Sequence, residues 1–437
     1  MTGPCQHYYR ASLGGESAFA IDPSSVVFGR GALRELGEHA RSLGLRRVGL
    51  FTDGVVRKLP FFEVAERSLR DAGMDVAVFG DVRIEPSDAS FLEAARFATD
   101  GRFDGYVSLG GGSVIDTTKV AALLATHPAE LLAYVNAPVG EGRAVPGPLP
   151  PHIACPTTSG TGSECTGIAI FDFIARKAKT GIASRRLRPS LAVVDPDVTR
   201  TLPETVVAAS GFDVLCHAIE SYTARPYTAR RVPPPPAPPT PASRPMSQGA
   251  NPWSDLGSLE ALRLAGRYLV RAVRDASDDE ARESMMWAST LAGIAFGNSG
   301  VHVPHGMAYA VGGLARGYRA PGYPDDHALV PHGISVVLSA PSVVRLLASV
   351  APERHQDAGR ALGLTITRPE DAGEVLGDGL LALMRTCALP GSLAEVGYAR
   401  ADVDELVRVT LMQQRLLDNA PRPIERDDLV QLFSSSL

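Results

Sequence analysis

The stretch YVSLGGGSVIDTTKVAALLA, residues 106–125, joins a short apolar run, three consecutive glycines and a helix-length apolar segment. This pattern predicts a β-strand that turns at Gly110, Gly111 and Gly112 directly into an α-helix. Glycines at such a turn let backbone N–H groups approach a phosphate closely, and the start of the helix adds partial positive charge. A tight turn needs glycines for its own geometry as well, so a diphosphate site and a purely structural turn both remain open.

Strands and helices alternate on both sides of this turn. We expect strands in RRVGLFTD (46–53), MDVAVFGDV (74–82), the beginning of PHIACPTTSGTGSE (151–164) and LAVVDP (191–196), and helices at 57–73 and 87–100. Such alternation favours a mostly parallel sheet with helices on both faces. Residues 1–201 are therefore predicted to form an α/β domain.

Two polar features accompany the expected strand ends. The Asp53 carboxylate at the end of VGLFTD is suited to accept hydrogen bonds from ribose hydroxyls and to repel a 2′-phosphate, or else to cap the following helix. The loop PTTSGTGSE (156–164) is rich in hydroxyl donors. In the common GxGxxG fingerprint the acid follows the glycine turn by about 20 residues, but here it precedes the turn. Any dinucleotide domain is therefore not the usual Rossmann domain.

The second half of the sequence has helical periodicity. Helices are expected at 202–223, 254–276, 278–297, 333–350 and 370–388, so residues 202–437 are predicted to form an all-helical domain. The segment RRVPPPPAPPTPASRPMSQGANP (230–252) is too rich in proline for the interior of a helix or strand. It is either a rigid surface loop between helices or a polyproline ligand for an adaptor domain.

Carboxylate and imidazole side chains gather in the helical half. In GFDVLCHAIESY (211–222), Asp213 and His217 are four positions apart and therefore share a helix face. The tetrapeptide VPHG occurs twice and places His305 and His332 at the start of apolar helices. One carboxylate and three imidazoles suit a divalent transition metal that keeps an open position for substrate.

Each of these residues also has an ordinary structural interpretation. Histidines in apolar segments are often core or capping residues, and we expect capping or substrate-facing roles for His302 and His327. Glu220 lies on the same helix face as Asp213 and is either a further ligand or a partner that supports one. Cys216 points away from that face and is expected in the core.

Composition excludes several classes of protein. A net charge of −5 leaves no basic excess for nucleic acid or an anionic membrane. No apolar run is long enough to span a bilayer, and MTGPCQHYYRASLGG resembles neither a signal peptide nor a mitochondrial presequence, so we expect a cytoplasmic location. The five cysteines contain no CxxC pair, which leaves oxygen and imidazole as metal ligands.

Five segments in a fixed order, GGGSVID, PTTSGTGSE, GFDVLCHAIESY, HVPHGMAYAVGG and ALVPHG, resemble the iron-dependent alcohol dehydrogenase family. The resemblance extends from FGRGALRELG (28–37) to the C-terminal helices. It implies an α/β dinucleotide-binding domain, an all-helical metal-binding domain and an active site in the cleft between them. It also implies NAD as cofactor and a divalent metal ion, Fe²⁺ or Zn²⁺.

The resemblance further assigns individual residues. The metal ligands would be Asp213, His217, His305 and His332. Cofactor contacts would come from Asp53 to the adenosine ribose, from Gly110, Gly111, Gly112, Ser113 and Asp116 to the diphosphate, from Thr157, Thr158 and Thr161 to the nicotinamide side, and from Lys179 to a ribose.

The chain reads HGMAY where many family members read HGMAH, so Tyr309 is the candidate for relaying the alcohol proton. Together with the proline-rich insertion before QGANPWSD (248–255), it most resembles one branch, the hydroxyacid-oxoacid transhydrogenases. That branch oxidises 4-hydroxybutyrate to succinate semialdehyde while reducing 2-oxoglutarate to 2-hydroxyglutarate. The alternative is an ordinary NAD-dependent alcohol dehydrogenase that releases NADH.

The expected partners are a small hydroxy acid or alcohol, an oxoacid and further copies of the chain. Substrate carboxylates require a cation, and Arg316 and Arg319 are the nearest arginines in sequence to Tyr309. Either they bind substrate or they are exposed and solvated.

Overall fold

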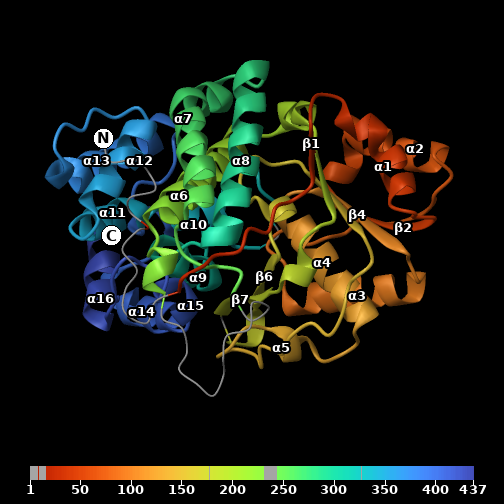
Figure 1. Ribbon diagram of the computed structural model, residues 1–437, viewed down its shortest axis with the longest axis horizontal. Coiled ribbons are helices and arrows are strands. Elements are labelled where there is room, and N and C mark those ends of the chain that lie inside the picture. The colour runs from red at the N-terminus through yellow and green to blue at the C-terminus, as the bar shows by residue number, and fades with distance from the viewer. Residues whose placement is uncertain (1–7, 9–15, 177, 231–243, 326) are drawn as a thin grey trace. The chain divides into compact units, whose positions relative to one another are not determined.

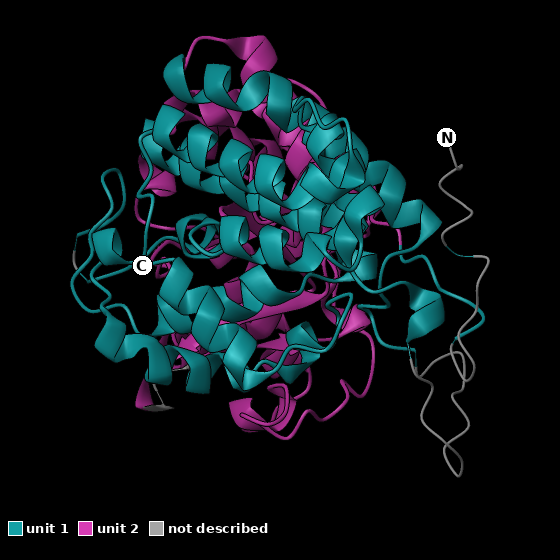
Figure 2. Cartoon of the chain, turned by 90° about the vertical axis from the view of Figure 1, so that its left-hand side faces the viewer, with its two compact units in different colours: residues 1–22, 204–275, 291–437 teal, residues 23–203, 276–290 magenta. Residues whose placement is uncertain are grey.

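The computed structural model describes residues 8, 16–176, 178–230, 244–325 and 327–437 (Figure 1). The chain divides into two compact units, which Figure 2 distinguishes by colour. Unit 1 takes the residues up to Asp22, residues 204–275 and residues 291–437, and unit 2 takes residues 23–203 and 276–290. The change of pattern expected at Leu202 falls beside a unit boundary, but neither unit is contiguous in sequence.

Unit 2 is built on a six-stranded sheet in which every pair of neighbouring strands is parallel. The strands, in the order β1-β8-β5-β4-β2-β3, are Val26–Phe28, Leu191–Val194, His152–Pro156, Gly105–Gly110, Arg47–Phe51 and Asp75–Phe79. All residues of β4 and β5 are buried, as expected for central strands with helices on both faces. The predicted parallel sheet is confirmed.

Each face of the sheet has its own apolar cluster, because side chains alternate along a strand. On one face Leu50 and Val107 pack with residues of α1 (Leu36–Ser42) and α2 (Pro60–Asp71). On the other face Phe51 and Tyr106 pack with residues of α3 (Asp88–Gly101) and α4 (Gly112–Thr126). Figure 1 shows α1 and α2 on one side of the sheet and α3 on the other. The remaining elements of unit 2 are α5 (Leu131–Tyr134) and the antiparallel hairpin β6 (Ile168–Phe173) and β7 (Ala178–Ala183).

The regular secondary-structure elements described in unit 1 are helices, as predicted. At its centre lies α6 (Glu204–Thr223), which is apolar on nearly all sides and buried along its length, as expected of a helix enclosed by other helices. Its neighbours include α7, α9, α10 and α12. The other helices with residues in unit 1 are α7 (Pro252–Arg274), α8 (Asp279–Ser299), α9 (Val303–Gly313), α10 (His332–Val337), α11 (Ala340–Ala348), α12 (Pro352–Ala361), α13 (Ala372–Thr386), α14 (Val403–Leu411), α15 (Gln414–Leu417) and α16 (Arg426–Ser435).

Two local predictions were wrong. The single helix expected at 333–350 is two helices, α10 and α11, because Pro341 occupies the first turn of α11 and cannot continue a preceding helix. The β6–β7 hairpin was missed because periodicity alone does not separate a short apolar strand from other buried segments.

Most of the proline-rich segment lies outside the described residues, so neither interpretation of it is tested. On its two sides, Arg230 and Arg244 both pair with Oε2 of Glu16, at 2.8 Å and 3.4 Å. Among the residues that the structure describes, no helix combines the length and the apolar character needed to cross a bilayer.

Candidate functional site

Helix α6 presents Asp213 and His217 on one face. Both side chains are buried, and the Nδ1 atom of His217 lies 3.7 Å from Oδ1 of Asp213. The ring of His217 stacks on Phe296, with the ring centroids 3.9 Å apart and the planes at 5°. The spacing in sequence and this stacking together point the imidazole at the carboxylate.

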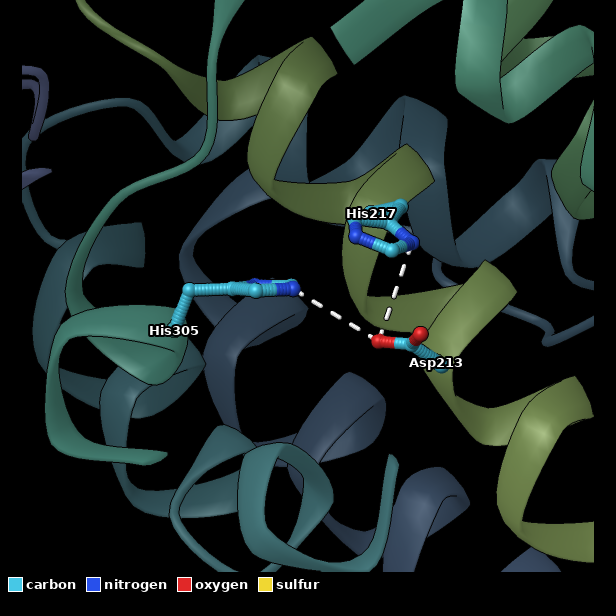
Figure 3. A group of neighbouring side chains, drawn as sticks. All are labelled: Asp213, His217 and His305. Atoms are coloured by element: carbon cyan, nitrogen blue, oxygen red, sulfur yellow. Dashed lines mark ion pairs between the residues drawn. The ribbon is translucent and has the colours of Figure 1, made fainter. Parts of the chain in front are cut away.

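Helix α9 supplies a third group to the same point. The Nε2 atom of His305 lies 3.5 Å from Oδ1 of Asp213, and Figure 3 shows the three side chains facing one another. We call Asp213, His217 and His305 the Asp213 cluster; one ligand atom from each lies within 4.8 Å of the others. Oδ1 of Asp213, Nδ1 of His217 and Nε2 of His305 are buried and have no hydrogen-bond partner among the described residues.

These separations fit a shared metal ion better than direct hydrogen bonds. At 3.5 Å and 3.7 Å the nitrogens are too far from the oxygen for good hydrogen bonds. Ligand atoms about 2.1 Å from a tetrahedral ion lie about 3.4 Å from one another. The three atoms can each donate an electron pair to a metal ion. They are buried, face one another and form no hydrogen bonds among the described residues, which is the arrangement expected of metal ligands.

His332 reaches the edge of this cluster. Its Nε2 atom lies 3.7 Å from Oδ1 of Asp213, and its side chain is 24% exposed. The second VPHG segment brings it there, because a Cβ at Gly333 would lie 1.9 Å from the carbonyl oxygen of Ala209 on α6. Only glycine permits this approach of α10 to α6. Tyr309 lies one turn beyond His305 on α9, on the same helix face, and is buried.

The charges around the cluster favour a cation. Burial alone would raise the pKa of the Asp213 carboxyl, but the surrounding imidazoles hold it well below its usual value. Burial lowers the pKa of His217 to about 3, so its ring is neutral at pH 7 and offers a lone pair. Burial would also lower the pKa of His305, but the carboxylates of Glu220 and Asp213 outweigh it and raise that pKa to about 9. Positive charge is thus stabilised at this point.

Glu220 and His302 hold the start of α9. Oε1 of Glu220 accepts a hydrogen bond from Nδ1 of His305 at 2.6 Å, and Oε2 accepts one from the backbone N–H of His302 at 2.6 Å. The His302 ring caps α9, because its Nδ1 accepts the N–H of Val303 at 2.8 Å. Of the two roles expected for Glu220, the structure favours the supporting one.

In unit 2 the glycine turn and the hydroxyl-rich loop lie together. Gly110 ends β4, and its carbonyl accepts the N–H of Thr157 at 3.0 Å. A Cβ at Gly112 would lie 2.7 Å from the side chain of Thr161, and one at Gly111 would touch Thr158. Two segments selected separately in the sequence therefore form one surface of backbone N–H and hydroxyl groups at the start of α4.

Asp53 and Ser113 both have protein partners near this turn. Oδ1 of Asp53 accepts the N–H groups of Val55 and Val56 at 2.8 Å and 2.9 Å, which is the capping role considered above. Oγ of Ser113 accepts the N–H of Glu85 at 3.1 Å. Their cofactor contacts remain predictions.

Asp116 and Lys179 are occupied inside unit 2. Oδ2 of Asp116 accepts the N–H of Ile170 at 2.9 Å, and its Oδ1 accepts from Lys119 and Ser163. Lys179 pairs with Oε2 of Glu85 at 2.6 Å and with Oδ1 of Asp172 at 2.9 Å. Burial alone would lower the pKa of Lys179, but these two carboxylates raise it above its usual value. Both residues face protein groups in this structure.

Sequence reasoning missed Lys119. This fully buried lysine donates to Oδ1 of Asp116 at 3.2 Å and to the carbonyl of Ile168 at 2.7 Å, and it also bonds Ser163 at the end of the hydroxyl loop. A lysine within the apolar helix segment 112–126 is the signal that could have marked it. In contrast, Arg316 is exposed and pairs with Asp402, so a substrate-binding role for it gains no support.

Two family models together match most of the chain. Residues 23–196 match the family model described as iron-containing alcohol dehydrogenase, and residues 245–437 match the C-terminal model of the Fe-containing alcohol dehydrogenase family. A mitochondrial hydroxyacid-oxoacid transhydrogenase from Bos taurus is 48% identical over 424 residues, which cover 96% of this chain and 90% of the relative. The protein of the same name from Homo sapiens is 47% identical over 423 residues, with the same coverage.

Solved structures share the fold. A 1,3-propanediol oxidoreductase superimposes with a TM-score of 0.83 at 29% identity, covering 96% of this chain and 100% of that one. A sulfoacetaldehyde reductase from Bifidobacterium kashiwanohense, solved in complex with NAD⁺, gives a TM-score of 0.77 at 25% identity, covering 96% of this chain and 99% of that one.

The cytoplasmic location expected from the sequence is contradicted by these comparisons. Both of the transhydrogenase relatives are named as mitochondrial proteins. The expectation rested on composition and on the opening residues. Targeting is read by import receptors and adds nothing to a folded core, so the composition of folded domains does not report the compartment.

Proposed function

The chain belongs to the iron-containing alcohol dehydrogenase family, and from this we propose that it is a hydroxyacid-oxoacid transhydrogenase that uses NAD and a divalent metal ion. It is an oxidoreductase by family membership. The observation that carries the metal-dependent chemistry is the Asp213 cluster, with its three buried and unbonded donor atoms. The identity to named transhydrogenases over nearly the whole chain supports the finer assignment.

We assign the metal to Asp213, His217, His305 and His332. A divalent metal there, Fe²⁺ by family or Zn²⁺ by ligand chemistry, would supply a Lewis acid for the substrate hydroxyl. The charge of Asp213 offsets that of the cation, and the neutral ring of His217 presents its lone pair. His332 is the most exposed of the four, so the substrate would approach from its side.

The nicotinamide cofactor is assigned to unit 2. Gly111 and Gly112 would present backbone N–H groups to the diphosphate, with Thr158 and Thr161 beside them. Asp53 would face a ribose and disfavour a 2′-phosphate, which is the basis for proposing NAD rather than NADP. The NAD⁺ complex of the sulfoacetaldehyde reductase supports this choice.

Tyr309 is the proposed proton relay. Its place one turn beyond His305 suits a hydroxyl that takes the substrate proton and returns it in the reverse half-reaction. The proposed cycle oxidises 4-hydroxybutyrate to succinate semialdehyde and then reduces 2-oxoglutarate to 2-hydroxyglutarate. A nicotinamide cofactor held in unit 2 would supply the hydride acceptor for the first half-reaction and the hydride donor for the second, so it would not need to leave the protein.

A turnover experiment without free cofactor tests this proposal. The protein is desalted, its bound NAD is quantified, and both substrates are supplied while both products are followed by chromatography. We expect many turnovers per active site, and a protein stripped of metal with a chelator should show none until metal is restored. A product yield that stops at one per site and rises only with added NAD would instead identify an ordinary dehydrogenase that releases NADH.

A further inference from the structure

Glu220 is a fully buried carboxylate directly behind the Asp213 cluster. It shares the α6 face of Asp213 and His217, at the i+7 and i+3 positions of these residues. Its two oxygens meet three N–H groups of the α9 start: Oε1 accepts from Nδ1 of His305 at 2.6 Å, and Oε2 accepts from the backbone of His302 at 2.6 Å and of His305 at 3.4 Å. Every donor in this group belongs to the segment that carries His305.

The bond to Nδ1 decides which nitrogen of His305 can bind a metal. A ring that binds a metal has lost its second proton to the incoming cation, and the carboxylate keeps the remaining proton on Nδ1. Nε2 is then the atom with the lone pair, and Nε2 is the atom that lies 3.5 Å from Oδ1 of Asp213. Glu220 therefore determines, through the His305 ring, that the free lone pair points toward Asp213.

We propose that Glu220 is a positioning residue that selects the metal-binding tautomer of His305 and fixes this ring at the Asp213 cluster; the inference rests on the proposed metal-dependent function. Glu220 acts through His305 and is not itself a ligand, because both of its oxygens are occupied by N–H donors. Within the described ranges no carboxylate is seen to hydrogen-bond the His217 ring, which instead stacks on the ring of Phe296. The two imidazoles are therefore held by different means.

The chemistry of the site requires a carboxylate rather than an amide. A glutamine of the same shape has one accepting oxygen and one donating NH₂ group. If its NH₂ faces His305, Nδ1 must accept, and the ring proton moves to Nε2, where it blocks the metal. If the NH₂ instead faces the backbone, it meets the N–H groups of His302 and His305, which leaves buried donors unpaired. The first arrangement prevents Nε2 of His305 from binding a metal, and the second destabilises the start of α9, which carries His305.

The test compares metal affinity in Glu220→Gln and in a matched control, Glu164→Gln. Glu164 is also a fully buried glutamate, but it lies in unit 2 on the hydroxyl loop, where its side chain contacts the thiol of Cys165. Metal-free proteins are titrated with Zn²⁺ against a chelator, and with Co²⁺ while its visible absorption is recorded. Loss of a partner that orients a ligand lowers metal affinity by about 10- to 100-fold. We expect that loss and a changed Co²⁺ spectrum in Glu220→Gln, and neither in Glu164→Gln.

A measurement on the parent protein tests the inference even if the Glu220→Gln variant does not fold. In Zn²⁺-loaded protein with ¹⁵N-labelled histidine, the coupling pattern of the His305 ring should identify Nδ1 as the protonated nitrogen. Protonation at Nε2, or an affinity and Co²⁺ spectrum of Glu220→Gln equal to those of the parent, would overturn the inference. If the parent protein itself binds no metal, it is the proposed function that fails, so the two failures are distinguishable.

Discussion

Two clusters of buried polar groups, one in each unit, satisfy their polar atoms in opposite ways. In the Asp213 cluster of unit 1, three buried atoms face one another and none has a hydrogen-bond partner among the described residues. In unit 2, Asp116, Lys119 and Ser163 bond to one another and to the backbone, and we call these residues the Lys119 cluster. Both clusters lie in segments that were expected to touch a small ligand or ion.

The difference shows how each kind of site is built. An unpaired buried polar group costs about 1–3 kcal/mol, so several in one place indicate a missing partner of opposite chemistry. A dinucleotide is too large to be held that way. The Lys119 cluster instead satisfies its charged side chains internally, and the glycine turn and the threonine hydroxyls are left to meet a ligand. Unbonded side chains mark the proposed ion site, whereas an open backbone marks the proposed nucleotide site.

Removing the carboxylate of the Asp213 cluster gives the largest expected effect. We expect Asp213→Ala to lose its metal and at least about 1000-fold of its activity, since one missing ligand costs several kcal/mol of metal affinity. The metal-free fold should persist, because Oδ1 of Asp213 makes no hydrogen bond within it. Metal analysis and thermal unfolding check both points, with the exposed Glu353→Ala as control. His332→Ala should behave like Asp213→Ala, and full metal occupancy in either variant would end the ligand assignment.

Glu164 gives a second test of this contrast. Its carboxyl group is buried in unit 2, and the groups around it do not offset the cost of ionising it there. Burial raises its pKa from 4.5 to about 7. Between these values the unfolded chain has released the proton and the folded chain keeps it, so this residue makes stability fall as pH rises from 4.5 to 7. The penalty is absent below pH 4.5 and complete above about pH 7, where it amounts to about 3 kcal/mol.

The Glu164→Gln variant should therefore be more stable than the parent at pH 8, with the difference shrinking toward pH 4.5. Denaturant unfolding of both proteins across this range measures it. The exposed Glu130→Gln change should produce no such pH-dependent difference. A constant difference between Glu164→Gln and its parent would mean that the buried carboxyl stays ionised in the fold.

The glycine turn of unit 2 gives the smallest expected effect. A Cβ at Gly112 would lie 2.7 Å from Cγ2 and 2.8 Å from Oγ1 of Thr161, so Gly112→Ala should displace the loop from the turn. We expect NADH to bind about tenfold more weakly, which corresponds to about 1.4 kcal/mol. Fluorescence titration measures this, and metal content should not change. Gly29→Ala is the control, because a Cβ there meets no atom within 4 Å. Unchanged NADH binding in Gly112→Ala would place the cofactor elsewhere.

Much of the fold was predictable because it follows from local patterns. The strands beginning at Arg47, Asp75 and Gly105 and the helices ending at Thr223 and Arg274 lie close to their predicted positions. Periodicity within one segment decides such elements. It does not decide where one helix stops when the apolar pattern continues, as at Pro341, or how a lysine in an apolar helix is satisfied, as at Lys119.

The sequence by itself determined the alternation of strands and helices, the ordered family motifs and the pairing of Asp213 with His217, because four residues along a helix always return to the same face. Only the tertiary structure decided how closely Nε2 of His305 approaches Oδ1 of Asp213 and that Glu220 holds the His305 ring. It also decided that Asp116 and Lys179 bond within the protein. Contacts within one element are fixed by backbone geometry, whereas contacts between elements depend on how closely they pack, which at Gly333 depends on the absence of a single side chain.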